Sequence, residues 1–263
     1  TEFAIGYLGT DELQPRERVP HTDFRPWHRP RKQFVRKRQW AAETKRLIGD
    51  LPAGPDLRYF GLAGTDLLDV IYFCSFNSAA APDSPEFTRQ NVAEQSVKQQ
   101  DIADARSVVV PDHLKQLGNV RSQAFNVARR HGPYDVINLD LCNGFWSDEP
   151  GGPDSLYAAM QSLASLQTRR DSPWLLFITS TVGEDSYNKA SEVKIVEVLK
   201  MVEQDCPTEF ELLELGPGWS LAMMDGPQRL RALMCAVAMW FNGILQNHVP
   251  TRLKACSSFS YRV

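Results

Sequence analysis

Several residue patterns that would define a function class are missing from this 263-residue sequence. The five cysteines lie far apart and form no CxxC pair, which argues against a zinc ribbon or a thioredoxin-like motif. The five histidines form no HxxxH or HxH pair, so we expect no metal site. The GxSxG and GxGxxG motifs are also missing, which disfavours a hydrolase and a nicotinamide-dependent oxidoreductase.

Long apolar runs and a strong net charge are absent as well. No stretch approaches the roughly 18 consecutive apolar residues of a membrane span, so we expect no membrane contact. The formal net charge of -3 is close to neutral and by itself selects neither nucleic acid nor a membrane as partner. An odd number of cysteines, mostly in apolar surroundings, indicates reduced buried thiols and predicts a cytoplasmic protein.

What the sequence does contain is an alternation of strand-like and helix-like segments. Short apolar runs typical of strands occupy residues 58–62, 71–76, 107–110, 134–141 and 174–179. Helical spacing of apolar residues occurs at 31–51, 120–130, 155–169, 191–204 and 227–247, and the polar stretch 87–100 is also expected to be helical. Such alternation predicts an α/β fold: a Rossmann-like, mainly parallel sheet flanked by helices, preceded by an N-terminal basic arm and helix. We expect residues 1–52 to form the arm and helix, and 53–263 the α/β domain.

Polar or glycine-containing turns follow the predicted strands, where a parallel sheet binds its ligands. They lie at residues 61–65, 76–78, 111–113 and 138–143. This succession resembles the class I S-adenosylmethionine-dependent methyltransferases over roughly residues 57–215. In that family the first strand ends in a glycine-rich turn and the second in an acidic residue that holds the ribose. An Asp near the adenine follows the third strand, and the fourth carries a polar motif beside the methyl-transfer site.

The resemblance implies a role for particular residues of this chain. Cofactor binding falls on Gly61, Gly64, Asn77 and Asp112, with Asn77 in the place of the ribose-binding acid. Catalysis falls on Asn138 and Asp140, although the Pro pair of the amine-methylating motif is absent from 138–142. The implied cofactor is S-adenosylmethionine.

Each of these residues also has a structural interpretation. The two glycines can simply form a tight turn after a strand, and Asp112 can cap a short helix over residues 113–117. Asp140 is harder to explain by packing, because burying a carboxylate costs several kcal/mol unless it is paired or hydrogen-bonded. Strand alternation places Asn138 and Asp140 on one face, which favours a functional role.

Residues 25–46 carry the clearest charge asymmetry. Nine positive residues are interleaved there with Trp27, Phe34 and Trp40, and only Glu43 opposes them. Basic and aromatic side chains together suit phosphate neutralisation and base stacking, so we expect nucleic-acid contact. The residues expected to make it are Arg31, Lys32, Arg36, Lys37 and Arg38. A solvated helix face or a protein-partner surface are the alternatives.

Two functions from different classes follow. The first is an S-adenosylmethionine-dependent methyltransferase-like protein that acts on or binds nucleic acid. The second is a non-catalytic subunit of the same fold that binds nucleic acid or a partner protein, favoured by Phe60 and Asn77 standing where acids are usual. The apolar face of residues 227–247 is broad enough for the core or for a homodimer interface.

Overall fold

The computed structural model describes residues 34–50, 57–62, 85–87, 108–141, 144–148, 151–152, 154–183 and 186–247. The chain divides into two compact units. One comprises residues 1–52 and 254–263, and the other comprises residues 53–253.

The described part of the smaller unit is one helical segment. A π-helical turn, η2 (Arg36–Trp40), continues directly into α2 (Ala41–Asp50), within the segment that the sequence predicts to be helical. Trp40 and Leu47 are buried, as expected for the apolar side of an amphipathic helix. Glu43 lies in the first turn of α2 and pairs with Arg46 one turn later at 2.7 Å.

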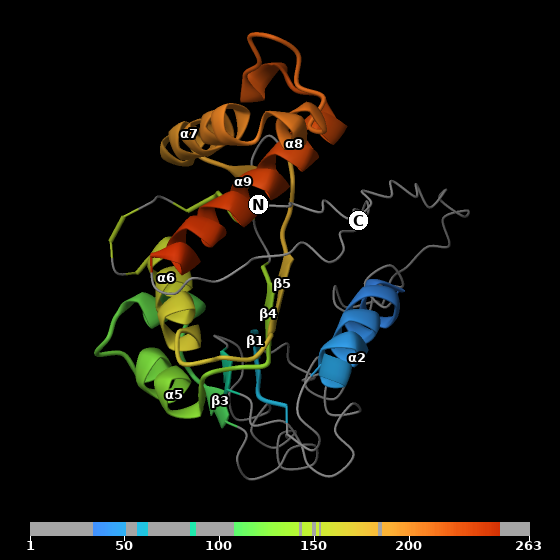
Figure 1. Cartoon of the computed structure of the whole chain (residues 1–263). Helices are drawn as coiled ribbons and strands as arrows, with labels where there is room; N and C mark the ends of the chain where they lie inside the picture. The colour runs from blue at the N-terminus through green and yellow to red at the C-terminus, as the bar shows by residue number, and fades with distance from the viewer. Residues whose placement is uncertain are drawn as a thin grey trace, which may run out of the picture. The chain divides into compact units, whose positions relative to one another are not determined.

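The larger unit is built on a parallel sheet (Figure 1). Its strands are β1 (Tyr59–Leu62), β2 (Pro85–Phe87), β3 (Val108–Val110), β4 (Val136–Asp140) and β5 (Leu175–Thr179). They lie in the order β3-β2-β1-β4-β5, and every neighbouring pair is parallel. The fold is therefore mixed α/β with a parallel sheet, as the alternation of segments predicts.

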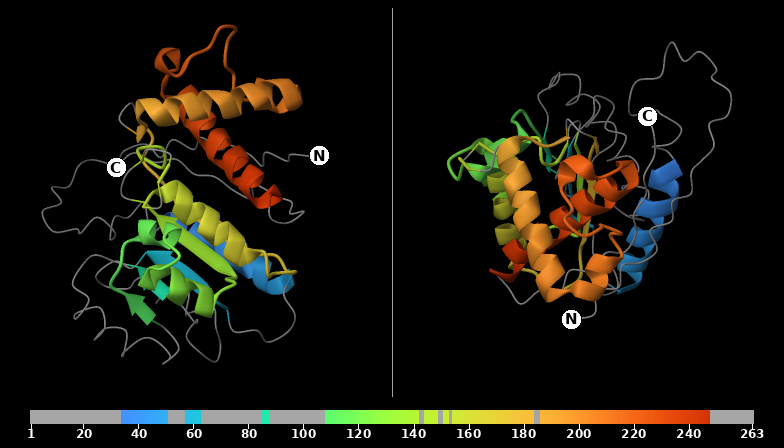
Figure 2. Two further views of the ribbon diagram at one scale, coloured as in Figure 1. Left: turned by 90° about the vertical axis from the view of Figure 1, so that its left-hand side faces the viewer. Right: turned by 90° about the horizontal axis from the view of Figure 1, so that it is seen from above.

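Three of the described helices of this unit lie between strands in the chain, and four follow the last strand (Figures 1 and 2). They are η3 (Leu114–Gly118), α5 (Gln123–His131), α6 (Leu156–Gln167), α7 (Lys189–Asp205), α8 (Pro207–Glu211), η5 (Leu221–Met223) and α9 (Gly226–Gln246). The four longest begin at a polar side chain that accepts a hydrogen bond from a first-turn amide: Ser122, Ser155, Asn188 and Asp225. These caps satisfy amides that have no partner within the helix and so mark each helix start in the sequence.

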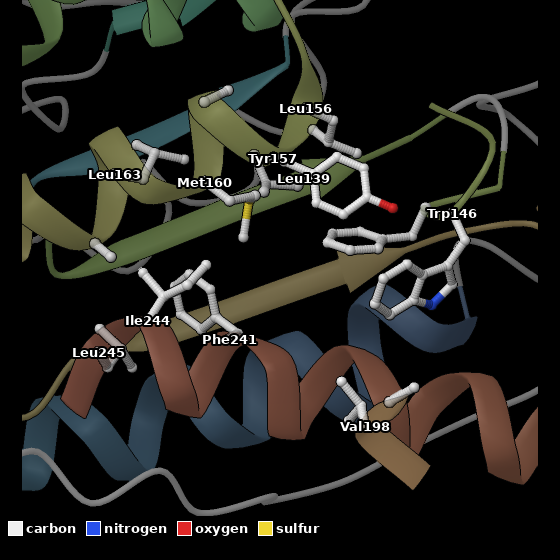
Figure 3. Packing of buried hydrophobic residues seen from close by; sticks show 14 of the residues in the cluster. Leu139, Trp146, Leu156, Tyr157, Met160, Leu163, Val198, Phe241, Ile244 and Leu245 are labelled. Atoms are coloured by element: carbon white, nitrogen blue, oxygen red, sulfur yellow. The ribbon is translucent and has the colours of Figure 1, made fainter. Parts of the chain in front are cut away.

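The hydrophobic core lies between one face of the sheet and the helices. Alternation along the strands directs Phe60, Ile137 and Leu139 to this face, where they join a single buried cluster with side chains of α5, α6 and α9. Figure 3 shows Met160 of α6 between Leu139 and the α9 residues Phe241 and Ile244. The apolar face of α9 thus packs in the core, which is one of the two alternatives that its sequence pattern left open.

Buried polar contacts hold the amino ends of the central strands. The Asp135 carboxylate pairs with Arg170 at 2.8 Å, both side chains being 8% exposed, and it accepts a 2.6 Å hydrogen bond from the Arg58 amide. The Asp135 backbone in turn donates to Arg58 and accepts from Leu175. Through its carboxylate and its backbone together, Asp135 thereby joins the starts of β1, β4 and β5.

Two sequence expectations need correction or completion. The helix expected over residues 87–100 is wrong at its first residue, because Phe87 closes β2, and residues 88–100 lie outside the described part of the chain. A three-residue strand is too short to show a period, and Pro85 is tolerated because it begins the strand. The expected strand 71–76 lies outside the described residues. No helix in the described part is long and apolar enough to cross a membrane.

Candidate functional site

The carboxyl ends of β1 and β4 form the point where the strand order reverses. From β1 the chain builds outward through β2 and β3, and it then returns to place β4 on the other side of β1. In register, Gly61 of β1 lies beside Asn138 of β4 and beside Glu86 of β2. Loops beyond such a switch point diverge and leave a crevice, so ligands of open parallel sheets bind there.

Asn138 is fully buried and contacts β1. Its side-chain amide donates a 3.2 Å hydrogen bond to the Tyr59 hydroxyl, which lies on the same face of the sheet. The Tyr59 ring reaches over Gly61: a Cβ atom at Gly61 would lie 2.2 Å from that hydroxyl oxygen. The lack of a side chain at Gly61 therefore makes room for Tyr59, which is a structural reason for this glycine.

Asp140 ends β4 and is half-buried. It lies in register with Thr179 at the end of β5, on the face that carries Asn138. The pairing continues one residue further, because the Leu141 amide donates to the Thr179 carbonyl at 2.9 Å. The carboxylate is thus carried by a regular strand in the middle of the sheet, where its position is well defined.

The segment that follows β4 is held against the segment that follows β5. The Phe145 amide donates to the Ser180 hydroxyl at 2.7 Å, and Trp146 forms a parallel bridge with Tyr187. Gly144 lies so close to Ser186 that a Cβ atom would stand 2.1 Å from the Ser186 carbonyl oxygen. Residues 144–146, which follow Asp140 in the chain, are therefore anchored to the segment that follows β5.

A polar network lies behind this anchored segment. The Tyr157 hydroxyl shares a 2.9 Å hydrogen bond with Ser191, which donates to the Asp148 carbonyl at 2.7 Å. Burial, and secondarily the Asp148 charge, raise the pKa of the Tyr157 phenol above its ordinary value despite the opposing Ser191 hydrogen bond. The Asp148 carboxylate pairs with Lys115 at 2.5 Å and accepts from the Leu156 amide. These contacts join η3, α6 and α7 and serve the scaffold.

Aromatic rings fill the space between the anchored segment and α9. Phe145, Trp146, Tyr157 and Trp240 all contact one another, with ring centroids 5.2–6.5 Å apart in tilted or edge-on arrangements. Such geometries add to the stabilisation that burial alone gives.

Asp112 follows β3, as the sequence predicts, but both of its carboxylate oxygens bind backbone amides. One accepts from His113 at 2.9 Å and the other from Ala124 in the first turn of α5 at 3.2 Å. The prediction that Asp112 caps the short helix near 113–117 is wrong in its residue, because the N-cap of η3 is His113; Asp112 instead binds the His113 amide and an amide in the first turn of α5. The amide-capping side chain of η3 is His113, which accepts from Lys115 at 3.2 Å.

Several sequence-predicted residues lie outside the described part of the chain: Gly64, Asn77, Arg31 and Lys32. Arg36 and Lys37 lie in η2, and only their backbone is described. Arg38 is exposed, with its guanidinium 5.8 Å from the centre of the Phe34 ring. The nucleic-acid role of this segment stays a prediction.

Sequence reasoning missed Glu86. The strand beside β1 is Pro85–Phe87, so Asn77 lies upstream of this strand rather than at its end, and the strand itself contains an acid. The Pro85-Glu86-Phe87 triplet is too short to be found by periodicity. Only the pairing with Gly61 and Val109 reveals it.

Among the residues that the structure describes, no group of three or more His, Cys, Asp or Glu side chains is placed to hold a metal ion. Asp140 and Asn138 are close in the strand, but the described side chains around them add no further ligand of this kind. The chemistry that the described site offers is hydrogen bonding and charge.

The architecture and the polar switch point define the molecule as a parallel α/β protein with a candidate ligand site at the carboxyl edge of its sheet. The chain belongs to the PP_RS20740-like family, whose model matches residues 21–263. No curated protein and no solved structure matches the chain.

Proposed function

We propose that this protein is a methyltransferase-like protein that binds S-adenosylmethionine at the carboxyl edge of β1, β2 and β4. The observation that carries the proposal is the half-buried Asp140 at the switch point, on the same face as Gly61 and Asn138. The strand order β3-β2-β1-β4-β5 is that of the first five strands of a doubly wound, Rossmann-like sheet, which supports this placement.

The residues at this edge suit the cofactor that the resemblance implies. In that family an acid at the end of the second strand holds the ribose hydroxyls, and β2 contains Glu86 one residue before its end, which makes Glu86 the candidate for the role expected of Asn77. A carboxylate accepts hydrogen bonds from two neighbouring hydroxyls, which a single amide oxygen does less well. Bound there, the cofactor would supply an electrophilic methyl group on a positively charged sulfur.

In this proposal Asp140 orients the methyl acceptor. A carboxylate at the end of β4 accepts a hydrogen bond from an amine or hydroxyl and aims its lone pair, and methyl transfer depends mainly on such positioning. Asn138 keeps Tyr59 in place through their hydrogen bond and so supports the floor of the site. Neither residue needs a metal ion for this role.

A specific observation favours a second candidate, a non-catalytic subunit of the same fold that binds nucleic acid or a partner protein. Asp112 and Gly61 both have structural roles, one as a double amide acceptor and the other as the space for Tyr59. Two of the positions that the resemblance assigns to the cofactor are thus accounted for without it.

Calorimetric titration with S-adenosylmethionine, and separately with S-adenosylhomocysteine, distinguishes the two candidates. We expect micromolar binding that Glu86→Gln weakens at least tenfold, while Asp140→Ala leaves cofactor binding largely intact and removes methyl transfer. The matched control is Asp171→Asn, which replaces an exposed carboxylate by a carboxamide at the amino edge of the sheet. If neither S-adenosylmethionine nor S-adenosylhomocysteine binds, the first candidate function is wrong. Asp112→Ala is a poor probe here, because it also removes two backbone hydrogen bonds.

A further inference from the structure

The amino edge of the sheet, opposite the proposed cofactor site, is lined by exposed arginines. Arg58 precedes β1, Arg129 and Arg130 end α5 just before β4, and Arg169 follows α6 just before β5. Hydrogen bonds join these segments: Arg169 donates to the Arg129 carbonyl at 3.2 Å, and the Asp135 amide donates to the Arg58 carbonyl at 2.8 Å. The four arginines therefore belong to one edge, by their positions before β1, β4 and β5. Figure 1 shows the connections from α5 and α6 entering β4 and β5 at the same edge.

Among the residues of this arginine edge that the structure describes, little negative charge opposes the arginines. In the described residues that form it, 57–58, 129–135 and 168–174, the carboxylates are Asp135 and Asp171. Asp135 is buried and already paired with Arg170, so its charge is neutralised locally. Asp171 is exposed and is left as the one acid of these segments against four exposed guanidinium groups.

Three of the four guanidinium groups also have no bonding partner among the described residues, while Arg169 binds the Arg129 carbonyl. The side chains of Arg58, Arg129 and Arg130 make no hydrogen bond or ion pair within the part of the chain that the structure describes. Other described arginines do: Arg46, Arg170 and Arg231 each pair with a carboxylate. A cation at the end of α5 is favoured by the helix dipole, but that effect accounts for neither Arg58 nor Arg169.

We propose that this arginine edge binds the phosphate backbone of nucleic acid. A planar guanidinium offers paired donors that match two phosphate oxygens, and several of them along one edge of the sheet match a polyphosphate chain better than a single bound anion. The exposed large apolar side chains of the described residues all lie elsewhere, among them Val120, Val193 and Met223. An anionic lipid surface is a poorer match, since stable membrane binding needs apolar anchors beside the charge.

This surface is independent of the cofactor site. The strand β4 has five residues and therefore four intervals, so its two ends are about 13 Å apart at roughly 3.3 Å per residue. Nucleic-acid binding at one edge and cofactor binding at the other can each be present or absent without the other. The inference is also distinct from the basic segment 25–46, which belongs entirely to the other unit.

The test is fluorescence anisotropy of a labelled 20-base-pair DNA duplex and its single strand, at several salt concentrations. The variant is Arg58→Gln/Arg129→Gln/Arg130→Gln, which leaves the Arg169 hydrogen bond intact. The matched control is Lys189→Gln/Lys194→Gln/Lys200→Gln on α7, which removes the same charge elsewhere. We expect the arginine variant to bind at least tenfold more weakly, with a salt slope reduced by roughly 0.9 for each phosphate that the protein no longer neutralises. We expect the lysine variant to stay within twofold of the unmodified protein.

Four results would overturn the proposal: no binding by the unmodified protein, equal weakening in both triple variants, unchanged binding in the arginine variant, or arginine-dependent binding to phosphatidylglycerol vesicles without binding to DNA. A third variant, Arg36→Gln/Lys37→Gln/Arg38→Gln, measures the basic segment separately. If this third variant loses DNA binding and the arginine-edge variant keeps it, the interaction belongs to the basic segment and the arginine-edge proposal is rejected. Far-ultraviolet circular dichroism of each variant checks that the helices are retained.

Discussion

Asp112 and Gly61 show that residue types typical of ligand sites can instead stabilise the fold. A carboxylate after a strand and a glycine in a strand are both typical of nucleotide sites, but here Asp112 receives two backbone amides and Gly61 leaves room for Tyr59. Asp140 differs from both, because strand geometry places it half-buried at the switch point. The neighbours of a residue, and not its type, separate these cases.

The close approach of Gly144 to Ser186 gives a test of the anchored segment. Gly144→Ala would put a Cβ atom 2.1 Å and 2.6 Å from two backbone atoms of Ser186, which cannot move without shifting the segments beyond β4 and β5. We expect a loss of about 1–3 kcal/mol in the free energy of unfolding, measured by urea denaturation. Gly243→Ala in α9, where nothing lies within 4 Å of the added atom, is the control and should stabilise slightly. Equal effects in the two variants would contradict the assigned contact.

Cys235 provides a second test at this scale. Burial, and secondarily the neighbouring Cys206, raise the pKa of the Cys235 thiol from about 9 to about 11. The folded state therefore holds this proton more tightly than the unfolded state. The protonated Cys235 thiol therefore contributes fully to the free energy of unfolding below pH 9, and this contribution is lost as the pH rises from 9 towards 11.

The corresponding measurement is alkylation of Cys235 by iodoacetamide, followed by peptide mass spectrometry. Because the thiolate is the reactive form, two pKa units predict about 100-fold slower modification at pH 8 in the folded than in the unfolded protein. The rate should climb steeply above pH 9. Equal alkylation rates at pH 8 in the folded protein and in the protein unfolded by guanidinium chloride would contradict the raised pKa of this thiol.

At the scale of elements, the Asp135–Arg170 pair ties three strands together. Asp135→Ala would leave a buried guanidinium without its carboxylate and the Arg58 amide without its acceptor. We expect a cost of about 3–5 kcal/mol in the free energy of unfolding. The comparison is Glu197→Ala, which removes the exposed Lys194–Glu197 pair and should cost under about 1 kcal/mol. A loss at Asp135 no larger than that at Glu197 would mean that the buried pair does not hold the strands.

Elements with a clear period could be predicted from the sequence, and those without one could not. Residues 134–141 and 174–179 contain β4 and β5, and the helices predicted over 155–169 and 227–247 contain or nearly match α6 and α9. These segments combine apolar spacing with capping residues such as Ser155 and Asp225, so local and tertiary preferences agree. The segment 210–215, by contrast, mixes Leu and Glu without a decisive period, and its start belongs to the short helix α8.

The candidate site was predictable only where a regular strand supports it. Asn138 and Asp140 share a strand, and their common face follows from alternation alone. The placement of Glu86 beside Gly61 depends on strand pairing between distant segments, which no local pattern encodes. Likewise, neither the second amide contact of Asp112 at Ala124 nor the reach of Tyr59 over Gly61 has a local signal in the sequence.

At the scale of the whole molecule, the larger unit presents two edges of different chemistry. The carboxyl edge carries Asn138 and Asp140 on β4, and the amino edge carries arginines on the connections. In a parallel sheet these edges are separated by the strand length, so each can bind its own ligand. This separation is what makes the two proposals independently testable.

Hydrogen-exchange mass spectrometry with saturating S-adenosylhomocysteine tests the central claim, a cofactor site at the carboxyl edge, most directly. Because the backbone beyond β1 and β4 would be covered by the ligand, we predict slower exchange in peptides spanning residues 61–66 and 140–148. Peptides spanning residues 128–134, at the amino edge, should exchange at the same rate with and without the compound. Unchanged exchange everywhere, or slowing confined to peptides away from the ends of β1, β2 and β4, would contradict the site.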